Sequence, residues 1–197
     1  MDFFVYSRDA AGTALRDDEE LLERHWSYMD AFAASMIARG PTLAADRETA
    51  TGSLHILGLP SVDAAREFVA DEPNNRAGVY ADHVIWRFEN LLGRTMWEFP
   101  GVAGEPRFLI LAYSDRVQSA AGRNRPVPHE SLPSELRERL ILYGALSTLD
   151  DAEPVGVALA VQAPDRDAVA ALLEDGWSGL DVSRGVEILN WEFGGRR

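Results

Sequence analysis

Apolar residues between positions 21 and 37 recur every three or four residues, the period of a helix with one buried face. The stripe consists of Leu22, Trp26, Met29, Ala33, Met36 and Ile37. Asp17 and Asp18 suit the start of such a helix, because carboxylates there meet unpaired amides. Gly40 followed by Pro41 is typical of a helix end. The pattern therefore predicts a helix over residues 17–39, with His25 at the edge of its apolar face.

The flanking segments are rich in β-branched and aromatic residues, as strands are. We expect four strands, over residues 3–8, 42–45, 53–59 and 79–88. The polar turn 46–51 joins the second and third strands into a hairpin. A second helix is expected over residues 60–70, where Ser61 is a good N-cap and one face is apolar. This order, β-α-β-β-α-β, is the ferredoxin-like arrangement.

The sequence resembles itself at an offset of 104 residues, as from Gly40 to Gly144. Seven of the 32 positions that begin at Gly40 are identical in the second copy. Ordinary composition would give about two identities by chance. We therefore expect a tandem duplication, with a first domain over residues 1–98, a Gly- and Pro-rich linker over 99–106 and a second domain over 107–197.

The second copy differs most in the region of the first helix. A long polar insert precedes a short helix, which is expected over residues 134–143. His129 is the arithmetical counterpart of His25, but it lies between Pro128 and Pro133, where a regular helix cannot continue. The second domain is therefore expected to be a degenerate partner that pairs with the first within the chain. The fold class predicted is α+β, with two ferredoxin-like units and antiparallel sheets.

Composition and charge narrow the function classes. A net charge of −13 argues against nucleic acid and anionic membrane surfaces as partners. The absence of cysteine excludes thiolate catalysis and disulfides and is compatible with a reducing compartment. No apolar run approaches the roughly 20 residues that span a bilayer, and the first residues lack the cationic region of a signal peptide. We therefore expect a cytoplasmic protein.

The common cofactor and nucleophile motifs are missing from the sequence. There is no GxGxxG, phosphate loop, GxSxG or HExxH motif. His55 and His83 lie in predicted strands without a neighbouring His, Asp or Glu at metal-ligand spacing. We therefore expect no metal site and no cofactor.

Several features of the first copy together point to a known family. They are Tyr6, Ser7, Arg8 and Asp9 at the end of the first strand, His25 in the helix, Gly40 and Pro41, Gly52 and Ser53, and the segment from Asp71, Glu72 and Pro73 to Tyr80. With these features, residues 2–89 resemble a YCII-related (YciI-like) domain. The resemblance implies the dimeric α/β-barrel superfamily, in which two ferredoxin-like sheets pack face to face. A tandem copy can supply both sheets from one chain, and a homodimer is also compatible with the resemblance.

The resemblance also assigns two candidate catalytic residues. The family's characteristic histidine falls on His25, and its acid after the first strand falls on Asp9. Members are thought to be enzymes because of such a pair, and a dehydrochlorinase of chlorinated hydroxyquinol is among them. Two positions depart from the family pattern: Glu72 stands where many members have Asp, and Asn74 where they usually have Tyr or Phe.

The functional hypothesis is a cofactor-independent lyase or isomerase acting on a small organic acid, aromatic or cyclic. His25, held by Asp9, would transfer the proton, since imidazole titrates near neutral pH. Each residue also has a structural interpretation, His25 as a core-edge histidine and Asp9 as a turn residue. The alternative function is a non-catalytic module that binds a small molecule or a partner on a duplicated scaffold.

Four residues are candidates for substrate binding. Tyr6 and Trp26 could line a cavity beside His25 or belong to the core. Asp46 recurs as Asp150, which favours a role in the turn. Arg76 could meet an anionic group of the substrate or remain solvated.

Overall fold

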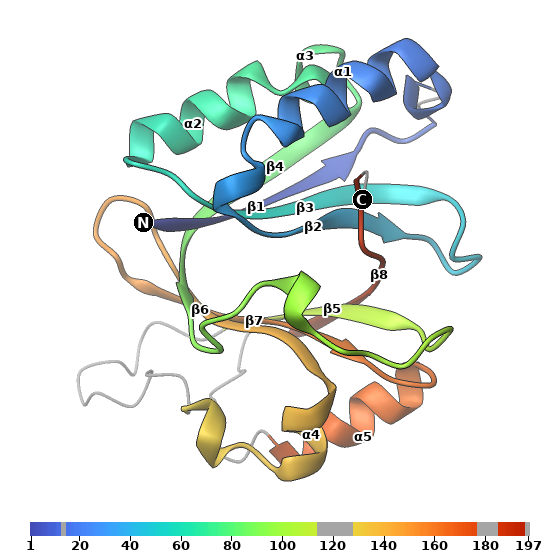
Figure 1. Ribbon diagram of the computed structural model, residues 1–197, viewed down its shortest axis with the longest axis vertical. Helices are drawn as coiled ribbons and strands as arrows, with labels where there is room; N and C mark the ends of the chain where they lie inside the picture. Colours follow the sequence, from blue (N-terminus) through green and yellow to red (C-terminus); the bar gives the residue numbers. More distant parts are fainter. Residues whose placement is uncertain (13–14, 114–127, 177–184, 196–197) are drawn as a thin grey trace.

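The computed structural model describes residues 1–12, 15–113, 128–176 and 185–195, so part of the polar insert of the second copy lies outside the described residues. Eight strands form one closed barrel in the order β1-β3-β2-β8-β5-β7-β6-β4 (Figure 1). They are β1 (Asp2–Asp9), β2 (Met36–Leu43), β3 (Ala50–Gly58), β4 (Tyr80–Asn90), β5 (Arg107–Tyr113), β6 (Leu140–Ser147), β7 (Pro154–Gln162) and β8 (Val186–Trp191). Neighbouring strands pair antiparallel throughout.

Helices cover two opposite outer sides of the barrel (Figure 1). On one side lie α1 (Glu19–Asp30), α2 (Val62–Asp71) and α3 (Pro73–Arg76), and on the other α4 (Ser134–Arg139) and α5 (Arg166–Gly176). Short 3-10 turns are η1 (Leu15–Asp17), η2 (Ala33–Ser35), η3 (Met96–Glu98) and η5 (His129–Ser131). The fold is thus mixed α+β with an antiparallel sheet. None of the helices in the described ranges has the length and apolar character needed to cross a membrane.

Side chains of each strand alternate between the barrel interior and an outer layer, because successive residues of a strand point to opposite faces. In β1, Phe4 and Tyr6 belong to the interior cluster, which also contains Leu109 and Trp191 of the second half. Phe3 and Val5 instead belong to the layer under α1 and α2. A separate apolar cluster contains residues of β5, β6 and β7 together with residues of α4 and α5.

The elements of the two halves recur at the spacing of the sequence repeat. β2 begins at Met36 and β6 at Leu140, and β3 begins at Ala50 and β7 at Pro154. In both cases the second element follows the first after 104 residues. The strand pairing repeats as well, since the β2–β3 register shifts across Ile37 and the β6–β7 register shifts across Ile141.

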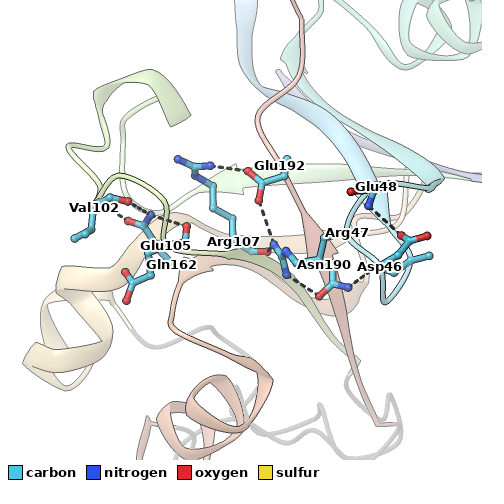
Figure 2. A network of polar contacts seen from close by, with 10 residues as sticks. Asp46, Arg47, Glu48, Val102, Glu105, Arg107, Gln162, Asn190 and Glu192 are labelled. Carbon is cyan, nitrogen blue, oxygen red and sulfur yellow. Dashed lines mark hydrogen bonds and ion pairs between the residues drawn. The ribbon is translucent and has the colours of Figure 1, made fainter.

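Two seams join the halves, and they differ in extent. At one seam β4 pairs with β6 over four residues, from Arg87 to Asn90. At the other, β2 pairs with β8 only through Thr42 and Leu43. Polar side chains extend this second seam (Figure 2). The strands of both halves therefore pair within one chain, as expected.

The side chain of Arg47, in the β2–β3 turn, makes the central contacts of the short seam (Figure 2). Its guanidinium donates to Asn190 Oδ1 at 2.9 Å, to the Arg107 carbonyl at 3.1 Å and to Glu192 Oε1 at 3.1 Å. Arg107 donates to the other oxygen of Glu192 at 2.6 Å. The turn of the first half is thereby tied to two strands of the second.

The predicted helix over residues 17–39 was wrong in its second part. The helix α1 ends at Asp30, and Met36–Leu43 form the strand β2. Gly40 is therefore no helix cap. A Cβ atom there would lie 1.9 Å from the Glu192 carbonyl oxygen, so glycine lets β2 approach the second half. The helix expected over 134–143 was too long for the same reason: α4 ends at Arg139, and β6 begins at Leu140.

Candidate functional site

A cavity of about 900 Å³ lies between α1 and the outer face of β2 and β3. The helix contributes His25, Trp26 and Met29 to its lining, and the strands contribute Arg39, Ser53 and His55 among others. The end of β1 and the following turn supply further residues, including Asp9 and Arg16. The cavity also receives Phe193, Gly194 and Gly195 from the second half. Both halves therefore build it.

His25 is held by a carboxylate on one of its two ring nitrogens. Its Nδ1 lies 2.6 Å from Oε1 of Glu72, and both side chains are largely buried, 12% and 4% exposed. The other oxygen of Glu72 accepts a hydrogen bond from the Asn75 backbone N–H at 2.7 Å. An ionised carboxylate only accepts hydrogen bonds, so in that form Glu72 would take a hydrogen bond from Nδ1–H of His25. Nε2 of the neutral ring is then the nitrogen that can accept a proton.

The local sequence explains how Glu72 reaches this position. Helix α1 starts at the N-cap Asp18, whose side chain accepts from Glu20 and Leu21, and this sets the face on which His25 lies. Glu72 is the N-cap of α3, directly before Pro73. A residue before proline is disfavoured in helical geometry, and Glu72 has the extended conformation that turns the chain between α2 and α3.

Asp9 also lines the cavity, but its carboxylate is bound to Arg16. Arg16 Nη2 lies 2.6 Å from Asp9 Oδ1, and Arg16 Nε contacts Oδ2. Arg16 Nη2 donates in addition to Ser53 Oγ at 3.1 Å. Burial lowers the pKa of Arg16, but the hydrogen bonds and charge of Asp9 outweigh it and raise the pKa above its usual value. The hydrogen-bonded partner of His25 is thus Glu72, rather than Asp9 as expected.

His55 is a second imidazole in the cavity wall. Its ring centroid lies 5.8 Å from that of His25, in an edge-on arrangement, and the residue is 3% exposed. Burial lowers the pKa of His55 well below its ordinary value, and the neighbouring imidazole of His25 and the charges of Arg39 and Arg16 lower it further. His55 is therefore neutral near pH 7, and a neutral imidazole carries one N–H donor.

Asn74 and Tyr80 complete the polar surroundings of the pair. Asn74 lines the cavity, and its Nδ2 donates to the Tyr80 hydroxyl at 3.3 Å. Burial, followed by the charge of Glu72, raises the pKa of Tyr80 to about 12, so the phenol is protonated near neutral pH. The guanidinium of Arg16 lies 5.6 Å from the centre of the Tyr80 ring.

The structure brings three of the six predicted site residues to the cavity, namely Asp9, His25 and Trp26. Tyr6 instead points into the barrel interior, where its hydroxyl lies 3.3 Å from Thr42 Oγ1. Asp46 stabilises the hairpin turn, since its carboxylate accepts from the backbone N–H groups of Glu48 and Thr49. The turn role that the sequence favoured for Asp46 is therefore observed.

Arg76, the sixth predicted residue, lies away from the cavity. Its side chain is 66% exposed and pairs with Asp71, 2.5 Å from Nη2 to Oδ1. It also donates to the Ala70 carbonyl at 3.3 Å. Arg76, the last residue of α3, thus stays solvated and close to the end of α2.

Sequence reasoning missed four polar residues of the cavity and its surroundings: Arg16, Arg39, His55 and Glu72. A signal existed in β3, where Ser53 and His55 alternate with buried apolar residues and so share one face. Glu72 was noted only as a departure from the family pattern. Within the described ranges, no group of three or more His, Asp or Glu side chains is arranged to hold a metal ion.

The second half differs from the first at the positions that correspond to Arg39 and His55. At the offset of 104 residues, Tyr143 takes the place of Arg39, and Leu159 takes the place of His55. Arg39 and His55 are cross-strand partners in β2 and β3, and Tyr143 and Leu159 are partners in β6 and β7. Both second-half residues lie in the apolar cluster with α4 and α5 residues. The two faces therefore correspond in position and differ in chemistry.

The last described residues cross from the second half onto β2. The backbone N–H of Gly194 donates to the Arg39 carbonyl at 3.0 Å, and that of Glu192 donates to the Pro41 carbonyl at 3.2 Å. A Cβ atom on Gly195 would lie 2.4 Å from the Arg39 guanidinium. This segment is therefore in close contact with the cavity wall.

The family model of the YCII-related domain matches residues 1–89. Among solved structures, 5-chloro-2-hydroxyhydroquinone dehydrochlorinase from Burkholderia phenoliruptrix AC1100, in complex with 2,5-dihydroxybenzoquinone, is 30% identical; the alignment covers 46% of this chain and 95% of that chain, with a TM-score of 0.42. No curated protein matches the chain.

Two further structures are similar over both halves. Chlorite dismutase from Candidatus Nitrospira defluvii, in complex with imidazole, is 7% identical over 97% of this chain and 91% of that chain, with a TM-score of 0.54. An anthrone oxidase-like protein is 10% identical over 100% of this chain and 92% of that chain, with a TM-score of 0.52. At such identities the likeness concerns the fold alone, which is of the dimeric α/β-barrel type. Through residues 1–89, the chain belongs to the YCII-related domain family.

Proposed function

We propose that the chain is a small-molecule enzyme in which His25 transfers a proton without a cofactor. The observation that carries this proposal is the 2.6 Å contact between His25 Nδ1 and Glu72 Oε1 at a cavity of about 900 Å³. A carboxylate on one ring nitrogen fixes the tautomer and orients the other nitrogen, as a general base requires. The cavity volume lies within the range of small-molecule sites.

The reaction class that fits is a lyase or isomerase step on a small organic acid, aromatic or cyclic. His25 Nε2 takes a proton from the bound substrate, and the Glu72 carboxylate stabilises the imidazolium that forms. The same imidazolium then returns the proton, either to another atom of the substrate or to a leaving group. Asp9 has a different role in this scheme, because it fixes Arg16 at the cavity wall.

We also propose that the two halves are duplicated ferredoxin-like units, over residues 1–98 and 107–197, joined by the linker 99–106. The recurrence of β2 and β3 as β6 and β7 after 104 residues supports this origin. The first unit carries the reacting groups. The second closes the barrel and supplies Phe193, Gly194 and Gly195 to the cavity.

Turnover of a panel of hydroxylated aromatic and cyclic acids tests the proposal. Once a substrate is found, His25→Asn should lower kcat about 10²- to 10⁴-fold, the usual contribution of general acid–base catalysis. His83→Asn is the matched control, because His83 is an exposed residue of β4 and does not line the cavity. Unchanged turnover by His25→Asn would refute the proposal. A wild-type chain that binds such acids but converts none of them would favour the binding-module alternative.

A further inference from the structure

Arg39 and His55 lie side by side on the cavity wall. They are direct cross-strand partners in β2 and β3, so their side chains point to the same face of the sheet. Both are buried, at 7% and 3% exposure, and both line the cavity. His25 reaches this cavity from the opposite side, on α1. A small bound molecule can therefore contact the two imidazoles and the Arg39 guanidinium at once.

The charges of this wall favour an anion. The charge of Arg16 is matched by Asp9, and Glu72 is bound to His25. Arg39 reaches Asp30 at 3.4 Å, and Asp30 is 44% exposed, so this ion pair is long and partly solvated. Arg39 lines the cavity with a buried side chain, and the planar fork of its guanidinium matches a carboxylate ligand.

The neutral imidazole of His55 adds a hydrogen-bond donor to the same wall. The neutral ring of His55 presents one N–H group, and it does not neutralise the positive charge of the Arg39 guanidinium. An oxygen anion bound there gains a hydrogen bond to a charged acceptor, which is stronger than a neutral one.

The second half shows that the barrel does not require these polar residues. Tyr143 and Leu159 occupy the same register in β6 and β7 and are buried among apolar side chains. Burial of a charged or polar group costs free energy unless it is compensated. An apolar pair serves the same structural position, so the presence of Arg39 and His55 in the first half points to a ligand contact rather than to a need of the fold.

We propose that Arg39 and His55 form the anion-binding wall of the cavity and hold the carboxylate or phenolate oxygen of the substrate. This inference deepens the proposed function and rests on it in one respect, namely that His25 acts on the opposite side of the bound substrate. Arg39 and His55 are thus specificity-determining residues: the wall selects organic anions over neutral molecules of the same shape. The binding step itself does not depend on proton transfer by His25.

Benzoate and its neutral isostere benzamide are suitable probes. Titration of the full-length chain, followed by calorimetry and by NMR of the labelled imidazoles, should show that benzoate perturbs the His55 signals and binds more tightly than benzamide. Arg39→Met and His55→Leu should each weaken benzoate binding about 10- to 100-fold, the equivalent of one hydrogen bond to a charged group. Their effect on benzamide should be small. Arg66→Met is the control, since Arg66 is an exposed residue of α2 outside the cavity.

Three outcomes would overturn the inference. They are equal affinity of the wild type for benzoate and benzamide, no binding of benzoate by the wild type, and unchanged benzoate affinity in both folded variants. Thermal unfolding checks that the variants fold, and His55→Gln replaces His55→Leu if the latter does not. His25→Asn should retain benzoate binding, so loss of turnover in that variant concerns the proposed function and leaves the anion site intact.

Discussion

Glu72 lies 47 residues after His25 in the chain, yet its Oε1 is 2.6 Å from the imidazole Nδ1. The contact joins the middle of α1 to the N-cap of α3. It is nearly excluded from solvent, with 4% of the Glu72 side chain exposed. A hydrogen bond to a buried carboxylate is stronger than one in water. The geometry of the proposed base therefore depends on the loop after α2, not on the strand β1.

Glu72→Gln should lower kcat on the substrate of this site by roughly 10- to 100-fold, the range for a partner that orients an imidazole. The amide can present only one acceptor oxygen, so it cannot accept from both His25 and the Asn75 N–H. KM should change less, because Glu72 binds the histidine and not the substrate. Steady-state kinetics measure both constants.

Two further variants distinguish a loss of His25 orientation from general damage to the fold. Asp71→Asn changes the neighbouring acid, which pairs with the exposed Arg76, and should leave kcat unchanged. Glu72→Asp keeps the charge and should recover part of the activity. Equal kcat for Glu72→Gln and the wild type would show that the contact has no catalytic role.

His55 should make the stability of the protein depend on pH. Its folded-state pKa lies well below the ordinary value near 6.5, so below pH 6.5 the unfolded chain binds a proton that the folded chain does not. Stability from this group is therefore complete above pH 6.5 and falls as the pH drops toward the folded-state pKa. Where only the unfolded chain carries the proton, the slope reaches about 1.4 kcal/mol per pH unit.

Urea unfolding at pH 7.5 and pH 5 measures this dependence. The difference in unfolding free energy between the two pH values should be smaller in His55→Leu than in the wild type, because the variant lacks this group. Exposed acids such as Asp46 contribute equally in both proteins and cancel in the comparison. An identical pH dependence in the variant would mean that His55 is protonated in the folded state.

The periodicity of the sequence predicted most of the elements, and it failed where two periods coincide. Met36 and Ile37 continue the helical stripe of Met29 and Ala33 and are equally suited to a buried strand. The same ambiguity at Leu140 and Ile141 extended the second predicted helix. A short apolar run cannot be assigned by period alone. Tertiary contacts decide it, here the pairing of β2 with β3 and of β6 with β7.

Only the part of the candidate site that follows from strand alternation and from the family pattern could be predicted from the sequence. Tyr6 and Asp9 are three residues apart in β1, so an extended strand places them on opposite faces. Alternation alone therefore separates Tyr6 from the cavity. The Glu72 contact was beyond reach, because it depends on how α2 and α3 pack against α1, which leaves no short-range signal in the sequence.

Gly40→Ala tests the close approach of the two halves. The added Cβ would lie 1.9 Å from the Glu192 carbonyl oxygen, so β2 and the segment after β8 must separate. Overpacking with backbone displacement costs about 3 kcal/mol or more. Gly58→Ala is the control, since the nearest atom to its Cβ is 3.4 Å away, on the Asp2 side chain. Urea denaturation should show a loss for Gly40→Ala well above that for Gly58→Ala, and equal losses would contradict the close packing.

Arg47 tests the polar part of the short seam (Figure 2). Arg47→Ala removes contacts to Asn190, Glu192 and the Arg107 carbonyl, and should lower the free energy of unfolding by about 1.5–3 kcal/mol. Arg47 has a φ of 60°, which favours glycine. Arg47→Gly loses the same contacts but relieves the backbone, so it should be more stable than Arg47→Ala by about 1 kcal/mol. If urea denaturation instead shows both variants as stable as the wild type, the β-ladders alone hold the halves together.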